Sequence, residues 1–163
     1  MKSVLIVCHA NTARSVMAQA LLERMLAHRL GLGRVRVRSA GVGPAARDGM
    51  IPSLDARLVL REEGIYLAED AQASIDLRRH PELVAEADLI LTMTVQQRLT
   101  VQMFDEGRGR AIYTLREFAG EEGDIGDPAA QGETAFRACR DEIKRYLLKS
   151  LDRFAGAKDA GAP

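Results

Sequence analysis

The N-terminal segment constrains the fold more than any other part of the chain. Four apolar residues, Val4–Val7, form the kind of continuous run that is typical of a strand buried on both faces. A short polar segment follows at Cys8–Arg14, and apolar residues then recur at helical spacing over Ser15–Leu30. A buried strand that leads through a short loop into an amphipathic helix predicts an α/β fold, because helices must cover both faces of such a sheet.

The rest of the chain continues this alternation of strands and helices. Further strands are expected around residues 34–38, 89–93 and 111–113. Further helices are expected at residues 52–63, 81–87, 94–106 and 133–154. The alternation predicts a parallel sheet, in which residues that follow the carboxyl ends of the strands meet at one edge. We therefore expect a single domain over residues 1–154 and a disordered tail at 155–163.

The composition excludes several classes of protein. Lys+Arg and Asp+Glu both number 23 among the 163 residues, so a zero net charge predicts neither a nucleic-acid nor a membrane partner. Two cysteines are too few for a disulfide framework, and no apolar stretch approaches the ~20 residues of a membrane span. We expect a cytoplasmic protein, and the sequence makes no prediction of its oligomeric state.

The segment from Cys8 to Ser15 can bind and attack a phosphate-sized anion. Backbone N–H groups at the start of a helix bind phosphate oxygens, and Arg14 can add bidentate hydrogen bonds. The helix N-terminus and the guanidinium both favour the thiolate, which is the reactive form of a cysteine such as Cys8. Asn11 tolerates the left-handed backbone angles of a tight loop, and Ser15 can donate its hydroxyl to the sulfur.

The Cys-x5-Arg spacing alone is a weak signal, because Cys139 and Arg145 also match it. That second pair lies within a helical pattern with no strand before it. Only the match at Cys8 has a strand, a loop and a helix in that order. Cys139 is expected in the core, because it shares one helical face with Phe136, Ile143 and Leu147.

The histidines predict no metal site. His9, His28 and His80 show no metal-ligand spacing with each other or with the cysteines. We expect His28 and His80 at the surface, and His9 at the border of the site.

Five motifs, in the same order along the chain, resemble those of low-molecular-weight protein tyrosine phosphatases, and most closely the bacterial protein arginine phosphatases among them. The first reads Val-Cys-x-x-Asn-Thr-x-Arg-Ser, and the five together are Val7–Ser15, Arg38–Val42, Ala87–Thr94, Tyr113–Glu117 and Asp127–Pro128. The resemblance runs from about Lys2 to Leu151.

This resemblance implies a three-layer α/β/α fold with a four-stranded parallel sheet, and a reaction in two steps. Cys8 matches the family's nucleophile, which forms a phosphocysteine, and Arg14 matches the residue that holds the phosphoryl group. Asp127 matches the general acid that protonates the leaving group and then activates water. The resemblance implies a phosphorylated protein as the substrate, and neither a metal nor an organic cofactor.

The resemblance also assigns the residues around the nucleophile. The phosphate-binding loop comprises His9, Ala10, Asn11, Thr12, Ala13, Arg14 and Ser15. Asn11, Ser15 and Ser39 match a hydrogen-bond network that shapes this loop. The chain departs from the family at Ala10, where glycine is usual, and at Ala13, where a second cysteine is common.

Two features favour phosphoarginine over phosphotyrosine as the substrate. Neither of the loops at 41–53 and 120–132 contains an aromatic residue that would stack on a tyrosine ring. Thr12 stands where arginine phosphatases have threonine and where tyrosine-specific relatives commonly have an aliphatic residue.

Other interpretations stay open at this stage. An arsenate reductase that uses an external thiol would share the fold and the anion loop, and a catalytically silent phosphate-binding module would share the binding residues. Asp127 precedes a proline and is compatible with a simple turn, which leaves Asp124 as the alternative acid.

Overall fold

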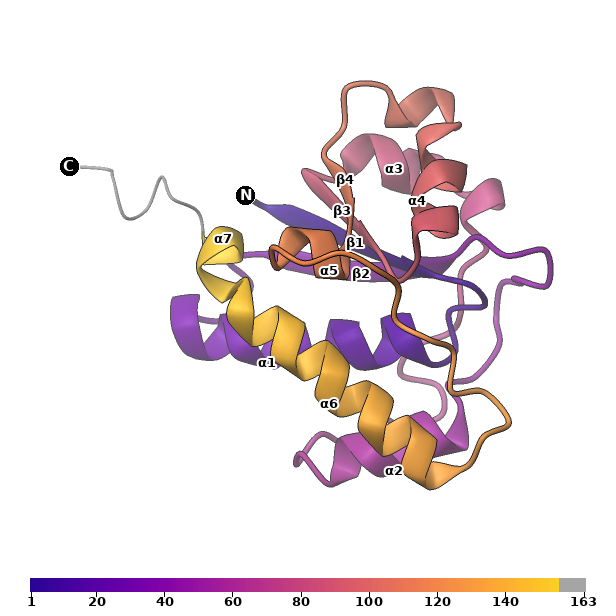
Figure 1. Ribbon diagram of the computed structural model, residues 1–163, viewed down its shortest axis with the longest axis vertical. Helices are drawn as coiled ribbons and strands as arrows, with labels where there is room; N and C mark the ends of the chain where they lie inside the picture. The colour runs from indigo at the N-terminus through magenta and orange to yellow at the C-terminus, as the bar shows by residue number, and fades with distance from the viewer. Residues whose placement is uncertain (156–163) are drawn as a thin grey trace.

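Four parallel strands form the centre of this computed structural model, which describes residues 1–155 of the chain (Figure 1). The strands are β1 (Ser3–Cys8), β2 (Arg36–Gly41), β3 (Leu89–Thr92) and β4 (Ile112–Thr114). They lie in the order β2-β1-β3-β4, and every pair of neighbours is parallel. The predicted four-stranded parallel sheet is therefore confirmed.

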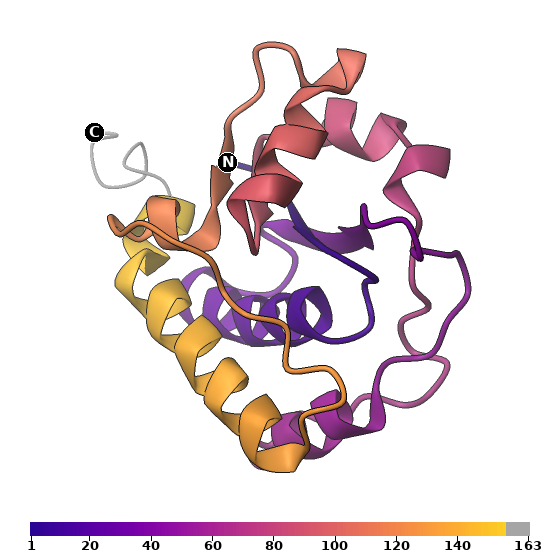
Figure 2. The ribbon, with the colours of Figure 1, turned by 45° about the vertical axis from the view of Figure 1, so that its right-hand side comes forward.

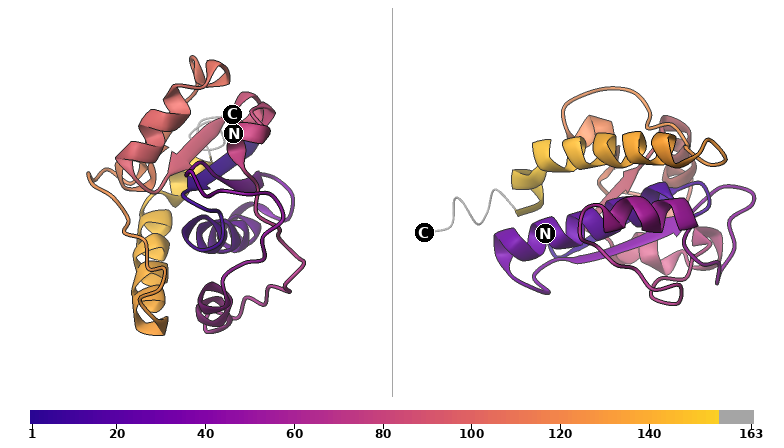
Figure 3. Two further views of the ribbon diagram at one scale, coloured as in Figure 1. Left: turned by 90° about the vertical axis from the view of Figure 1, so that its right-hand side faces the viewer. Right: turned by 90° about the horizontal axis from the view of Figure 1, so that it is seen from below.

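Helices cover both faces of this sheet and make three layers (Figure 3). One face carries α1 (Arg14–Leu30), α2 (Leu54–Arg61), α5 (Leu115–Phe118), α6 (Glu133–Lys149) and α7 (Leu151–Ala155). The other face carries α3 (Glu82–Glu86) and α4 (Val95–Gln102). None of the described helices is both long enough and apolar enough to cross a membrane.

Alternate residues of β1 supply the two cores. Val4 and Ile6 pack into the cluster beneath α1 and α6, whereas Leu5 and Val7 pack into the cluster beneath α3 and α4. This is the period of two that a pleated strand imposes, with both faces apolar because both are covered. Cys8 is the last residue of β1, so it lies at the edge of the sheet where the strands end.

Most elements differ by one or two residues at an end from the sequence predictions, and β2 and α4 differ by more. The strand expected around 34–38 is Arg36–Gly41, because β2 pairs with β1 residue by residue from Ser3↔Arg36 to Cys8↔Gly41. The helix expected at 94–106 ends at Gln102, and a separate 3-10 turn follows at Asp105–Gly107.

The C-terminal helix expected at 133–154 is broken at Ser150. The Ser150 hydroxyl donates a hydrogen bond of 2.8 Å to the carbonyl oxygen of Tyr146, a contact that commonly bends helices. Apart from Ala155, which ends α7, the predicted tail at 155–163 lies outside the described residues.

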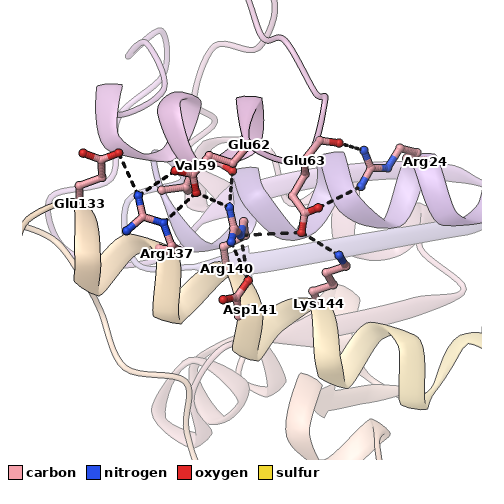
Figure 4. A network of polar contacts seen from close by, with 9 residues as sticks. All are labelled: Arg24, Val59, Glu62, Glu63, Glu133, Arg137, Arg140, Asp141 and Lys144. Atoms are coloured by element: carbon pink, nitrogen blue, oxygen red, sulfur yellow. Dashed lines mark hydrogen bonds and ion pairs between the residues drawn. The ribbon is translucent and has the colours of Figure 1, made fainter.

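A network of charged residues joins α2 to α6 (Figure 4). The buried Arg140 guanidinium donates to the Val59 carbonyl oxygen at 2.8 Å and to Glu62 at 2.7 Å. Arg137 binds the other carboxylate oxygen of Glu62 at 2.7 Å. These hydrogen bonds, that of Arg137 above all, lower the pKa of Glu62 to about 2. The network fixes the C-terminal end of α2 against α6, and each of these helices follows a loop of the site described next.

Candidate active site

The loop that joins β1 to α1 is held in one shape by backbone contacts. Asn11 has a φ of 62°, the left-handed conformation expected for it from the sequence. Gly41, at the end of β2, lies directly against this loop. A Cβ atom there would lie 2.8 Å from the carbonyl carbon of Ala10 and 2.8 Å from the carbonyl oxygen of His9. Ala10 itself takes an ordinary conformation, since among the described non-glycine residues only Asn11 and Ala130 have positive φ.

The start of α1 faces this loop with unsatisfied N–H groups. Within the described chain, no side chain caps the helix at Ala13, and its first turn contains no acidic residue. The first four N–H groups of a helix have no partner inside it, and the helix dipole makes that end positive. The loop and the helix start can therefore hold an anion.

The sulfur of Cys8 lies on a small pocket of about 60 Å³, formed by the loop on one side and by Asp127 and Ala129 on the other. The residue is only 2% exposed. The Ser15 hydroxyl oxygen lies 2.9 Å from the sulfur, and the Asn11 backbone N–H donates to it at 3.3 Å. Both groups are placed to stabilise negative charge on the sulfur.

Asn11 links this sulfur environment to β2. Its side-chain amide donates to the Ser15 hydroxyl at 2.8 Å and to the Ser39 hydroxyl at 2.9 Å. Its carbonyl oxygen accepts the Ile75 backbone N–H at 2.9 Å. The three polar residues that the sequence analysis grouped, Asn11, Ser15 and Ser39, thus lie in one buried cluster.

Two glutamines extend this cluster, and neither was predicted from the sequence to belong to the site. The Ser39 hydroxyl donates to the side-chain oxygen of Gln19 at 2.6 Å, and Gln72 donates to the same oxygen. Gln19 follows Ser15 by four residues on α1, a spacing that places both on one helical face. That spacing is the signal that identifies Gln19, whereas nothing in the sequence brings Gln72 to it.

Arg14 lies between the loop and the segment that joins α5 to α6. This segment passes the N-terminal end of α1 on its way to α6 (Figure 2). Arg14 is 4% exposed and donates from Nη1 to the carbonyl oxygen of Ile125 at 2.8 Å. Its Nη2 atom lies 3.7 Å from the carboxylate of Asp127. The Ile125 carbonyl is a further contact that the sequence does not indicate.

The two candidate acids on this segment differ in their surroundings. Asp127 lines the pocket, its side chain is 46% exposed, and one carboxylate oxygen accepts the Ala129 backbone N–H at 3.0 Å. Asp124 instead accepts the Val95 backbone N–H at 2.8 Å, at the start of α4. Of the two, only Asp127 lies on the pocket that contains Cys8.

Thr12 and His9 both line the pocket, together with Ala10 and Ala13. The backbone of Thr12 is fixed by its carbonyl oxygen, which accepts the Ser53 N–H at 2.9 Å. Phenylalanine, tyrosine and tryptophan are all absent from the described residues that line the pocket.

Cys139 is buried in the core, as its place on the helical face of α6 predicts. Its thiol lies 3.8 Å from the carbonyl oxygen of Gly126. Burial raises the pKa of Cys139 to about 12, so this thiol stays protonated at neutral pH. A protonated, buried thiol is poorly suited to resolve an intermediate formed on another cysteine.

Comparison with known proteins extends over almost the whole chain. Residues 3–158 match the family described as low molecular weight phosphotyrosine protein phosphatase. A protein-arginine-phosphatase from Geobacillus stearothermophilus is 38% identical over 152 residues, which are 92% of this chain and 94% of that protein. A probable low molecular weight protein-tyrosine-phosphatase from Ralstonia nicotianae is 34% identical over 144 residues, 88% of this chain and 90% of that protein.

Solved structures give the same result. The YwlE arginine phosphatase from Geobacillus stearothermophilus superposes with a TM-score of 0.82 at 34% identity, over 97% of this chain and 96% of that one. A low molecular weight protein tyrosine phosphatase from T. tengcongensis superposes with a TM-score of 0.81 at 30% identity, over 94% of this chain and 99% of that one.

Proposed function

This chain belongs to the low-molecular-weight phosphotyrosine protein phosphatase family of cysteine-dependent phosphoprotein phosphatases, and we propose that its preferred substrate is phosphoarginine in proteins. The observation that carries this preference is the lining of the pocket. Thr12, which stands where arginine phosphatases have threonine, lines the Cys8 pocket. The described lining residues include no phenylalanine, tyrosine or tryptophan that would form a wall for a tyrosine ring. Similarity to two protein-arginine-phosphatases, at 38% and 32% identity, supports the same choice.

In the first step, the Cys8 thiolate attacks phosphorus and the P–N bond to the guanidine breaks. The loop N–H groups and Arg14 hold the phosphoryl oxygens, because both are donors that converge on the pocket. Asp127 donates a proton to the departing guanidine nitrogen, and the products are a phosphocysteine and an unmodified arginine. The position of Asp127 on the Cys8 pocket and the exposure of its side chain support this role.

In the second step, Asp127 takes a proton from water as the water oxygen attacks phosphorus. The S–P bond breaks, inorganic phosphate leaves, and the Cys8 thiolate is restored. Asn11, Ser15 and Ser39 act as positioning residues, since they hold the loop and the hydroxyl beside the sulfur.

The test compares two peptides of identical sequence, one with phosphoarginine and one with phosphotyrosine, at the same central position. We expect the purified protein to hydrolyse the phosphoarginine peptide with the higher kcat/KM, and Cys8→Ser to hydrolyse neither. A higher kcat/KM for the phosphotyrosine peptide would refute the preference. Activity that survives in Cys8→Ser would refute the assignment of the nucleophile.

Thr12→Ile tests the basis of this preference. An aliphatic side chain at this position should shift the ratio of the two kcat/KM values toward phosphotyrosine. An unchanged ratio would show that Thr12 does not select the substrate.

A further inference from the structure

A groove of about 420 Å³ opens beside the Cys8 pocket. His9, Arg14 and Asp127 line both the pocket and the groove, so the two are continuous. From there the groove extends to Asp124 and to the start of α4. A protein whose phosphorylated side chain fills the pocket must place its neighbouring residues nearby, and this groove has room for them.

The groove contains a fixed hydrogen-bond donor that faces its open space and has no partner among the described residues. Gln97 lines the groove but is only 7% exposed. Its side-chain oxygen accepts the backbone N–H groups of Met93 at 3.0 Å and Thr94 at 3.1 Å, and these two bonds fix the orientation of the amide. Among the described residues, no acceptor lies within hydrogen-bond distance of its Nε2 atom.

A donor that is held in one orientation and open to the groove can bind a ligand with an acceptor. Exchanging water for such an acceptor contributes a net ~0.5–1.5 kcal/mol, and the two hydrogen bonds to the amide oxygen have already fixed the orientation of the donor. The most frequent acceptor in a polypeptide is the main-chain carbonyl oxygen, which every residue carries. A substrate chain that enters the groove therefore brings the group that Gln97 lacks.

The charge of the groove favours a cationic neighbour in the substrate. Its carboxylates are those of Asp124 and Asp127, and its one guanidinium is that of Arg14. Arg14 is already bound to the Ile125 carbonyl and faces the pocket, where a phosphoryl group neutralises it. With substrate bound and Asp127 acting as the proton donor, the carboxylate of Asp124 is left as the negative charge of the groove.

We propose that this groove binds the substrate polypeptide beside its phosphorylated residue. Gln97 donates a hydrogen bond to a main-chain carbonyl oxygen, and Asp124 favours a lysine or arginine within one or two residues of the phosphorylated position. The inference rests on the proposed function, since it concerns the flanks of the same phosphorylated side chain.

The donor is tested with Gln97→Glu. Glutamate keeps an oxygen for the N–H groups of Met93 and Thr94 and replaces the –NH₂ group by a second oxygen. Gln102→Glu is the matched control, because it makes the same change at an exposed position on the same helix, outside the groove. The substrates are a phosphoarginine peptide and p-nitrophenyl phosphate, which has no polypeptide to bind.

We expect Gln97→Glu to lower the ratio of kcat/KM for the peptide to that for p-nitrophenyl phosphate by about five- to tenfold, chiefly through KM. Gln102→Glu should leave the ratio unchanged. Equal losses on both substrates, or a ratio that does not move, would overturn the role of Gln97. Absence of turnover on both substrates by the wild-type protein would instead refute the proposed function itself.

The charge is tested with Asp124→Asn, which keeps an oxygen for the Val95 N–H but removes the carboxylate. Peptides with lysine or glutamate beside the phosphoarginine are compared at low and high salt. We expect the wild-type protein to prefer lysine by about two- to fivefold at low salt, and the preference to disappear in Asp124→Asn and at high salt. A preference that persists in Asp124→Asn would overturn this part of the proposal.

Discussion

Replacement of Asn11 should strongly destabilise the protein. Asn11→Ala removes three hydrogen bonds: two buried ones to the Ser15 and Ser39 hydroxyls and a partly buried one from the Ile75 N–H. Each contributes a net ~0.5–1.5 kcal/mol. Alanine must also take the left-handed conformation of Asn11, with a φ of 62°, at a cost of about 1 kcal/mol. We expect the free energy of unfolding to fall by about 3–5 kcal/mol.

Urea unfolding followed by circular dichroism measures this loss, with Asn11→Gly as the matched variant. Glycine removes the same hydrogen bonds but adopts positive φ without strain, so Asn11→Gly should be more stable than Asn11→Ala. Both variants should also lose turnover, because Ser15 is no longer held beside the Cys8 sulfur. A loss below about 1 kcal/mol in Asn11→Ala would refute the hydrogen-bond argument. A glycine variant less stable than the alanine variant would refute the backbone argument.

Three further predictions concern protonation. Asp127→Ala should lower kcat on phosphoarginine by about 10²–10⁴-fold, and on activated aryl phosphates far less, because only the poor leaving group needs a proton. Equal losses of kcat on both substrates would show that another residue is the general acid. Iodoacetamide at pH 8 should alkylate Cys8 and not Cys139, because burial raises the pKa of Cys139 to about 12. Detection of alkylated Cys139 in the folded protein by mass spectrometry would contradict this prediction. Glu62, with its pKa lowered from 4.5 to about 2, should stabilise the fold above pH 4.5 and lose this effect as the pH falls toward 2. The unfolding free energies of the wild-type protein and of Glu62→Gln should therefore converge in acid. A difference between the two free energies that persists at pH 2 would argue against the ion pairs of Glu62 with Arg137 and Arg140.

The parts of the site that the sequence predicts are local. The strand, loop and helix around Cys8 follow from hydrophobic periodicity and from the tolerance of Asn11 for positive φ, because these depend on residues close in the chain. The topology of a parallel sheet also predicts that the segment containing Asp127 reaches the same edge.

The contacts that the sequence does not predict join segments far apart in the chain. The Arg14 guanidinium binds a carbonyl oxygen 111 residues away, at Ile125, and any residue type supplies such an oxygen. Gln72 reaches Gln19 through the path of an irregular loop, which hydrophobic patterns do not describe. The orientation of the Gln97 amide, with its oxygen bound and its –NH₂ group facing the groove, follows only from the positions of all its neighbours.

The side chains that support the phosphate loop are all neutral. The cluster behind Cys8 comprises three buried residues, Asn11, Ser15 and Ser39, and two half-buried ones, Gln19 and Gln72. None of these side chains gains or loses a proton between strongly acidic and strongly basic conditions. Changes of pH or ionic strength therefore leave the hydrogen bonds within this cluster unaltered. These five side chains add no titration of their own to the pH dependence of turnover.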